Sequence, residues 1–237
     1  MRLNFAGERV LAVMAHPDDA ELLCAGTLAR AKQDGAAIAV CVMCTGDKGL
    51  PSGAPVGNLG EVRHREAGDA AKVLGAELLW FGCPDGDLVD APAARRQLVE
   101  LYRQFTPTLV VAHAPDDYHA DHRAASALAE AASWFCASRG HVTESPPMAG
   151  PPAVWFADTI NMQGFSAQFY VDISDQAEVK RRMLECHHSQ LLRGKDKDLA
   201  PLMDLMVRQC QARGAQADVA AAEAFRPHQA FRRLRAW

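Results

Sequence analysis

Two short segments of this chain place histidine and aspartate side chains at spacings that suit metal-assisted hydrolysis. The first is Ala15–Glu21, with the sequence AHPDDAE, in which one imidazole is followed closely by two adjacent carboxylates. The second runs from His113 to His122 and ends in the string HADH. Histidine and carboxylate side chains hold catalytic zinc, and such a site also needs a base for the attacking water and an acid for the leaving group.

The spacing alone leaves several ligand sets open. His119 and His122 stand three residues apart, so at the start of a helix they would share one face. Asp18 and Asp19 are adjacent, so their side chains diverge, and one can bind metal while the other faces the water. Either aspartate could instead cap a helix, and the histidines could be unconnected surface groups. Together, however, the two clusters supply more nitrogen and oxygen donors than one metal needs.

Both segments directly follow apolar runs that predict β-strands. The predicted strands are Val10–Ala15, Ala36–Cys44, Glu77–Phe81, Thr108–Ala112, Ala153–Phe156 and Phe169–Ile173. Between them, helical patterns span Glu21–Gln33, Glu61–Leu74, Ala93–Phe105, Arg123–Ser138 and Gln176–Leu192. The alternation predicts an α/β fold with a Rossmann-like, open, mostly parallel sheet covered by helices on both faces. Sites in such sheets lie beyond the carboxyl ends of the strands, where both clusters fall.

Two stretches interrupt the alternation. Residues 46–60 hold five glycines and two prolines, which predicts a loop bordering the site. Ser145–Pro152 is a second irregular segment, and the residues beyond it are too few and too helical for a separate domain. We therefore expect a single domain over 1–237, with a C-terminal helical elaboration from about residue 175.

Composition narrows the function classes. The 25 basic and 29 acidic residues leave a net charge of −4, which argues against a nucleic-acid binder. No apolar run is long enough for a membrane span, and the N-terminus lacks a signal-peptide core. Seven cysteines, an odd count, indicate reduced thiols and a cytoplasmic protein. A nucleotide-binding oxidoreductase is disfavoured because the first strand leads into HPDD rather than a glycine-rich phosphate turn.

Six segments together resemble one family, the LmbE-like or PIG-L-type zinc-dependent N-deacetylases of N-acetylglucosaminyl compounds. The matching segments, in the family's order, are Ala15–Glu21, Cys44–Gly49, Glu61–Ala67, His119–Arg123, Phe169–Ser174 with Lys180 and His187–Gln190, and Ala222–Arg226. The resemblance implies a hydrolase that removes an N-acetyl group from an amino sugar. It also implies homo-oligomers, while the aglycone of the sugar stays open.

By position, the resemblance makes His16, Asp19 and His122 the zinc ligands. His and carboxylate ligands also accept other divalent ions. Asp18 becomes the general base, which takes a proton from the attacking water and passes it to the leaving amine. This assignment agrees with the expectation that one aspartate binds metal while its neighbour handles protons.

The resemblance gives roles to four further residues. It implies that His119 stabilises or protonates the tetrahedral intermediate and that Asp121 orients a neighbouring imidazole. Arg63 matches an arginine that holds substrate or oxyanion, although its spacing from Glu66 also suits an intrahelical ion pair. Asp85 is a looser match to a contact with a sugar hydroxyl.

The chain departs from the family pattern at two places. Ala120 replaces a common proline, which removes only a backbone constraint. The sequence CAGT at residues 24–27 replaces a glycine pair, which leaves local packing or substrate fit open. Two alternative functions are a non-catalytic, metal-containing sugar-binding protein and an amidase for another N-acyl substrate. Whether His113 or His187 takes part in the site cannot be decided from their positions in the chain.

Overall fold

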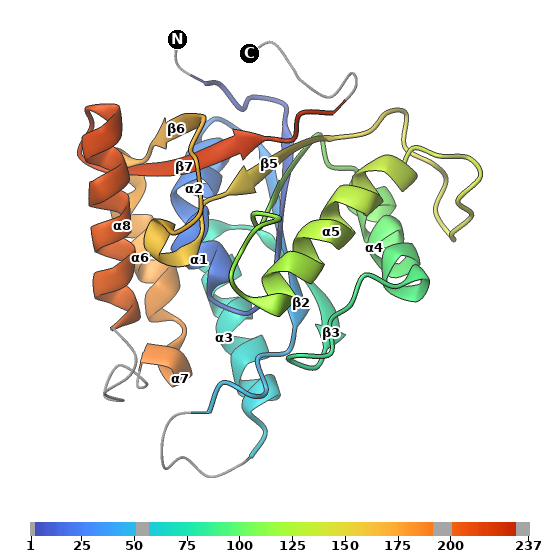
Figure 1. The fold of residues 1–237 in the computed structure, drawn as a ribbon, viewed down its shortest axis with the longest axis horizontal. Coiled ribbons are helices and arrows are strands. Elements are labelled where there is room, and N and C mark those ends of the chain that lie inside the picture. Colours follow the sequence, from blue (N-terminus) through green and yellow to red (C-terminus); the bar gives the residue numbers. More distant parts are fainter. Residues whose placement is uncertain (1–2, 51–56, 192–200, 231–237) are drawn as a thin grey trace.

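The sheet predicted from the sequence is present and is mostly parallel. The structure, a computed structural model, describes residues 3–50, 57–191 and 201–230. Within them the strands are β1 Arg9–Met14, β2 Ala37–Cys44, β3 Glu77–Cys83, β4 Leu109–Ala112, β5 Ala153–Ala157, β6 Phe169–Asp172 and β7 Ala222–Pro227. Their order across the sheet is β3-β2-β1-β4-β5-β7-β6 (Figure 1). The first five pair in parallel, and β7 pairs antiparallel with both β5 and β6.

Helices cover both faces of this sheet, as expected. They are α1 Asp19–Leu23, α2 Ala25–Gln33, α3 Leu59–Leu74, α4 Pro92–Phe105, α5 Ala120–Phe135, α6 Ala177–Glu185, α7 His188–Leu191 and α8 Leu202–Ala217, with 3₁₀ turns η1 Ile160–Met162 and η2 Ser174–Gln176. The side chains of β1 alternate between the two faces: Val10, Ala12 and Met14 pack with α1, α2, α3, α6 and α8. Leu11 and Val13 pack with α4 and α5 on the other face. Figure 1 shows α4 and α5 on one side of the sheet and α2, α6 and α8 on the other. Among the described residues, no helix is both long and apolar enough to cross a membrane.

Several predicted boundaries were wrong. The helix predicted over residues 21–33 begins at Asp19 and is interrupted at Cys24, whose φ of −147° leaves the helical region. The pattern over 176–192 divides into η2, α6 and α7. The predicted C-terminal helical elaboration does contain α6, α7 and α8, but it also supplies β7, which inserts into the sheet between β5 and β6.

The strand order explains why the two His/Asp clusters meet. From β1 the chain proceeds to β2 and β3 on one side, and it then crosses to β4 on the other side. The order therefore reverses between β1 and β4, and a crevice opens beyond the carboxyl ends of strands at such a point. The segment after β1 holds His16, and the segment after β4 leads to His119 and His122.

Candidate active site

The turn after β1 directs two carboxylates to different partners. Asp18 is the residue before α1, and its φ of 104° is a strained conformation for a residue other than glycine. Its side chain makes no cap hydrogen bond to α1, so the capping interpretation was wrong for Asp18. Asp19 turns the other way, and its Oδ2 accepts a hydrogen bond from the His16 backbone N–H at 2.7 Å.

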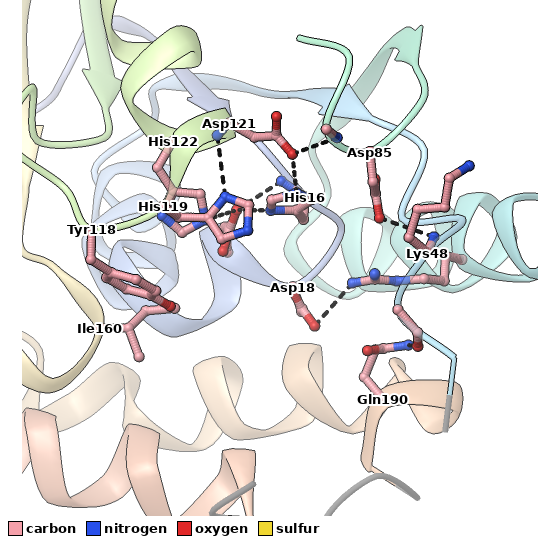
Figure 2. A pocket seen from close by; sticks show the side chains of 14 residues that line it. His16, Asp18, Lys48, Asp85, Tyr118, His119, Asp121, His122, Ile160 and Gln190 are labelled. Carbon is pink, nitrogen blue, oxygen red and sulfur yellow. Dashed lines mark hydrogen bonds and ion pairs between the residues drawn. The ribbon is translucent and has the colours of Figure 1, made fainter. Parts of the chain in front are cut away.

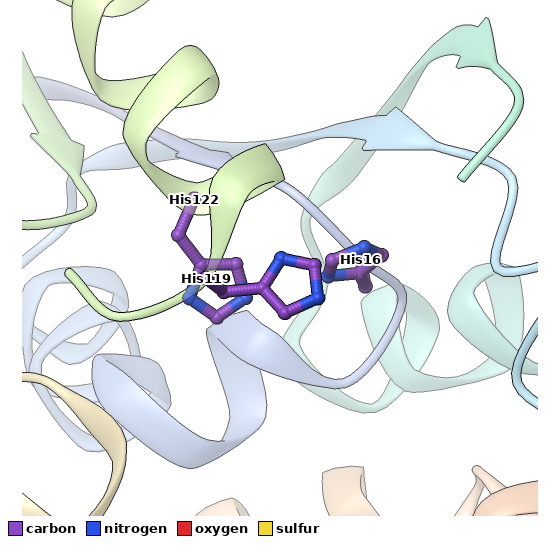
Figure 3. A group of neighbouring side chains, drawn as sticks. All are labelled: His16, His119 and His122. Atoms are coloured by element: carbon purple, nitrogen blue, oxygen red, sulfur yellow. The ribbon is translucent and has the colours of Figure 1, made fainter. Parts of the chain in front are cut away.

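The segment after β4 brings the second cluster to the same place. His119 is the residue before α5, and Asp121 and His122 lie in the first turn of that helix. The imidazoles of His16, His119 and His122 converge from the two segments (Figure 3). One nitrogen from each of these rings lies within 4.8 Å of the others, so the three rings could hold a metal ion.

Neighbouring carboxylates indicate which ring nitrogens can donate a lone pair to a metal. His16 Nε2 lies 3.1 Å from Asp121 Oδ2, and His122 Nδ1 lies 3.1 Å from Asp117 Oδ1. Each of these nitrogens therefore carries a proton toward its carboxylate, which fixes the tautomer. In the neutral rings, which metal binding requires, the lone pairs are then on His16 Nδ1 and His122 Nε2, each of which lies 3.4 Å from Asp19 Oδ2.

Two other histidines nearby, His119 and His113, each use one ring nitrogen to accept a backbone N–H. His119 Nδ1 accepts the backbone N–H of Asp121 at 3.2 Å, so a neutral ring carries its proton on Nε2. His113 is fully buried, stacks on His122 with ring centroids 4.0 Å apart, and accepts the Ala15 N–H on Nε2 at 2.9 Å. The nitrogen lone pair of His113 nearest Asp19 is therefore already used, which favours a packing role over a ligand role.

Burial and neighbouring charges shift the pKa values of these groups. Burial raises the pKa of the Asp18 carboxyl, although the Arg63 guanidinium opposes that shift. Burial also acts to raise the pKa of Asp19, but the His122 and His113 imidazoles outweigh it and hold this pKa well below its usual range. For His16, burial acts to lower the pKa, and the hydrogen bond and charge of Asp19 overcome it and raise the pKa to about 9.

Arg63 reaches the site from α3. Its Nη2 lies 3.1 Å from Asp18 Oδ2 and also donates to the Pro17 carbonyl, while Nη1 donates to the Gly46 carbonyl at 3.3 Å. The intrahelical pair with Glu66 was a wrong alternative, because Glu66 instead accepts two hydrogen bonds from Ser189. The Arg63 guanidinium therefore holds the turn that carries Asp18 and links it to Gly46.

A pocket of about 440 Å³ surrounds these groups (Figure 2). All the predicted site residues line it, together with residues that the sequence did not single out: Lys48, Gly49, Gly86, Tyr118, Ile160 and Gln190. Tyr118 and Ile160 lie on one side of the histidines, and Lys48, Asp85 and Gln190 lie on the other (Figure 2). Gln190 belongs to the matched segment His187–Gln190, which was the available signal for it, whereas Ile160 had none.

Asp85 lies at the edge of the pocket, and His187 lies outside it. The Asp85 carboxylate accepts the N–H groups of Gly46 at 2.7 Å and Lys48 at 3.2 Å, so it holds the loop at the pocket edge. Its contact with a sugar hydroxyl stays a prediction. His187 is fully buried, 3.4 Å from Glu21, and does not line the pocket.

The chemistry of the donors fits a divalent metal. Two imidazole lone pairs and one carboxylate oxygen converge, and each of the two imidazoles is held by a carboxylate through its other nitrogen. This is the number of protein ligands that a catalytic zinc site takes when one position is left for water. The remaining carboxylate, Asp18, lies beside this set without joining it.

Comparisons with known proteins show which sequences this chain resembles. The family model described as PIG-L, GlcNAc-PI de-N-acetylase, matches residues 11–133, more than half of the chain. The diacetylchitobiose deacetylase of Thermococcus kodakarensis is 30% identical over 196 residues, which cover 77% of this chain and 70% of that protein. The 4-oxalmesaconate hydratase of Pseudomonas putida is 25% identical over 198 residues, covering 79% and 76%.

A solved structure extends the likeness over nearly the whole fold. The conserved protein TT1542 from Thermus thermophilus superposes with a TM-score of 0.79 at 31% identity, covering 97% of this chain and 100% of that one. The matched family model and the relative at 30% identity lead to one conclusion: the chain belongs to the PIG-L family of de-N-acetylases.

Proposed function

We propose that this protein is a zinc-dependent hydrolase that removes the N-acetyl group from an N-acetylglucosamine-type amino sugar. The observation that carries the proposal is the convergence of His16, Asp19 and His122 beside the buried carboxylate of Asp18. The family match and the relative named as a diacetylchitobiose deacetylase support the substrate class.

In this proposal His16, Asp19 and His122 hold the zinc ion. When bound, zinc polarises the acetamide carbonyl and makes water a better nucleophile. Asp121 acts by orienting the His16 ring, since its Oδ2 faces His16 Nε2 and also accepts the Gly86 N–H at 2.9 Å. When the His16 ring is neutral, Asp121 thus favours the tautomer that has its lone pair on the metal-facing Nδ1.

Asp18 handles the protons. Arg63 holds its Oδ2, so we assign Oδ1 to accept the proton of the attacking water and to return it to the leaving amine. His119 presents its Nε2 proton to the oxygen that gains charge in the tetrahedral intermediate, because its Nδ1 is occupied by a backbone N–H. Asp85 and Arg63 are the residues we expect nearest the sugar.

A second candidate reaction, hydration, follows from the hydratase relative. The charge of the pocket argues against it. Apart from the histidines, the basic side chains among the described lining residues are Lys48 and Arg63, and each is already paired with an aspartate, Asp47 or Asp18. A substrate with several carboxylates would meet few available cations there, whereas a neutral sugar needs none. The non-catalytic binder is disfavoured because Asp18 and His119, the residues to which we assign the proton transfers, both line the pocket.

Acetate release from a panel of N-acetylglucosamine compounds tests the proposal, using metal-free protein with zinc added back. The panel includes other N-acyl amides and an unsaturated polycarboxylate as controls. We expect release from the amino sugars only when zinc is present. Hydration of the polycarboxylate, or tight sugar binding without turnover, would replace the proposal with the hydratase or the binder. A cytoplasmic homo-oligomer belongs to the same proposal, and sedimentation of the pure protein tests the oligomer.

A further inference from the structure

Behind the pocket, two opposite charges are buried together. Lys180 of α6 and Glu223 of β7 are 1% and 4% exposed, and Lys180 Nζ lies 2.5 Å from Glu223 Oε1. Neither residue lines the pocket, and both lie beyond residues 11–133, which the family model matches. In Figure 1, α6 lies beside α1 and α2, the helices that follow the turn after β1 in which Asp18 lies.

Both charged groups bind the backbone where α1 ends and α2 begins. Glu223 accepts the Gly26 N–H on Oε1 at 2.9 Å and the Thr27 N–H on Oε2 at 2.7 Å. Lys180 Nζ donates to the Leu22 carbonyl at 2.9 Å. These are N–H groups of a helix start and a carbonyl of a helix end, which the helices themselves leave without partners. The Lys180–Glu223 pair therefore holds the interruption at Cys24 between the two helices, the α1–α2 break.

The break matters because α1 is short. It has five residues, begins at Asp19, and is preceded by Asp18 in its strained conformation. One turn of helix is not stable by itself, so contacts with the rest of the protein set its position. Lys180 binds the carbonyl of Leu22, three residues after Asp19 in the same turn. A displacement of this end therefore moves the end that bears the metal-facing carboxylate.

Stability alone does not account for two charges at this point. Buried ion pairs can often be replaced by well-packed apolar residues of similar volume without loss of stability, because desolvation of both ions offsets their attraction. An apolar pair could not, however, bind two backbone N–H groups and one carbonyl. We propose that Lys180 and Glu223 are positioning residues, which fix the α1–α2 break and thereby hold Asp18 and Asp19 in place.

Two variants of the full-length protein and one control test this inference. Lys180→Met removes the donor to Leu22 and leaves Glu223 charged and unpaired. The double variant Lys180→Met/Glu223→Gln is neutral, so it avoids the unpaired buried charge, but its single amide oxygen cannot reproduce both carboxylate contacts. Arg103→Met is the matched control, because Arg103 is also buried and binds backbone carbonyls including those of Cys136 and Ser138, away from the pocket.

The readouts are zinc affinity, by competition with a chromogenic chelator, and kcat and KM on an N-acetylglucosamine compound. In both Lys180 variants we expect zinc affinity and kcat to fall about tenfold, the low end for residues that support metal ligands, with KM changed less than kcat. We expect the double variant to unfold at a higher temperature than Lys180→Met yet to stay impaired. Arg103→Met should lose thermal stability with kcat and zinc affinity unchanged.

Two results would overturn the inference. One is a double variant with the zinc affinity and kcat of the parent protein, which would make the pair purely structural. The other is an equal loss of kcat in Arg103→Met, which would mean that activity follows stability. If Lys180→Met does not fold, the double variant carries the comparison. The kcat readout rests on the proposed reaction and the zinc readout on the proposed metal site, so a parent protein that binds zinc without deacetylase activity leaves the zinc comparison decisive.

Discussion

Replacing a glycine within a helix by alanine usually stabilises the protein. At Gly26, which lies in the sequence that replaces the family's glycine pair, we expect this substitution to destabilise it. A Cβ added at Gly26 would lie 2.7–2.8 Å from three side-chain atoms of Ile173, including its Cβ. Because the Ile173 Cβ is attached directly to the backbone, rotation of the side chain cannot relieve the contact. Ile173 is fully buried, so the backbone of α2 must shift instead.

The expected magnitude follows from two opposing effects. Alanine favours a helix over glycine by at most about 1 kcal/mol, and less in the first turn. Overpacking a rigid core costs about 1–3 kcal/mol, and a contact with a Cβ belongs at the upper end. We therefore expect Gly26→Ala to lower the free energy of unfolding by about 2 kcal/mol. For a chain of this size that corresponds to a fall in Tm of about 4–8 °C.

Gly68→Ala is the matched control within α3. A Cβ there would find only Leu78 Cδ2, at 4.0 Å, so the helix preference acts without a clash. We expect Gly68→Ala to raise the free energy of unfolding by about 0.5–1 kcal/mol. Thermal unfolding of both variants, followed by circular dichroism, measures the difference. If Gly26→Ala proves as stable as Gly68→Ala, the reasoning from the Ile173 contact is wrong.

Two further predictions concern single carboxylates. Asp121→Asn removes the charge that orients His16, so we expect zinc affinity to fall 10- to 100-fold in chelator competition, and an unchanged affinity would contradict the orienting role. At Glu100, hydrogen bonds from Ser145 and Thr143 lower the pKa from 4.5 to about 2. A lowered pKa stabilises the fold above the unfolded-state value, so the advantage over Glu100→Gln should be constant above pH 5 and decline as the pH falls from 4.5 to 2. Urea unfolding across that range checks this, and a constant difference down to pH 2 would refute it.

Local patterns predicted the fold class because the buried strands are continuous apolar runs bounded by helical periodicity. The strand β7 escaped prediction since its sequence, AEAFRP, contains alanine and charged residues that do not favour strands. Its place in the sheet depends on pairing with β5 and β6, and the buried Glu223 within it is paired with Lys180 and with two backbone N–H groups. Such partners are distant in the chain and leave no local signal.

The break at Cys24 also depends on residues that are distant in the chain. Residues 21–33 carry an uninterrupted helical pattern, and the interruption depends on Glu223, which binds the N–H groups of Gly26 and Thr27. In the site, motif positions indicated which residues converge. They indicated that Asp121 orients a neighbouring imidazole but not that this ring is His16, because the contact joins two separate segments. They also did not indicate that a neutral His119 ring is protonated on Nε2, which follows from the contact of its Nδ1 with the Asp121 N–H.

The measurement that tests the central claim most directly compares Asp18→Asn with the parent protein at equal zinc occupancy. Asparagine tolerates a positive φ, so the variant keeps the strained backbone and the size of the side chain while losing the base. We predict that zinc still binds and that kcat for acetate release falls by about 10²- to 10⁴-fold, the contribution of a positioned general base. Acetate release at the parent rate with zinc bound would contradict the account.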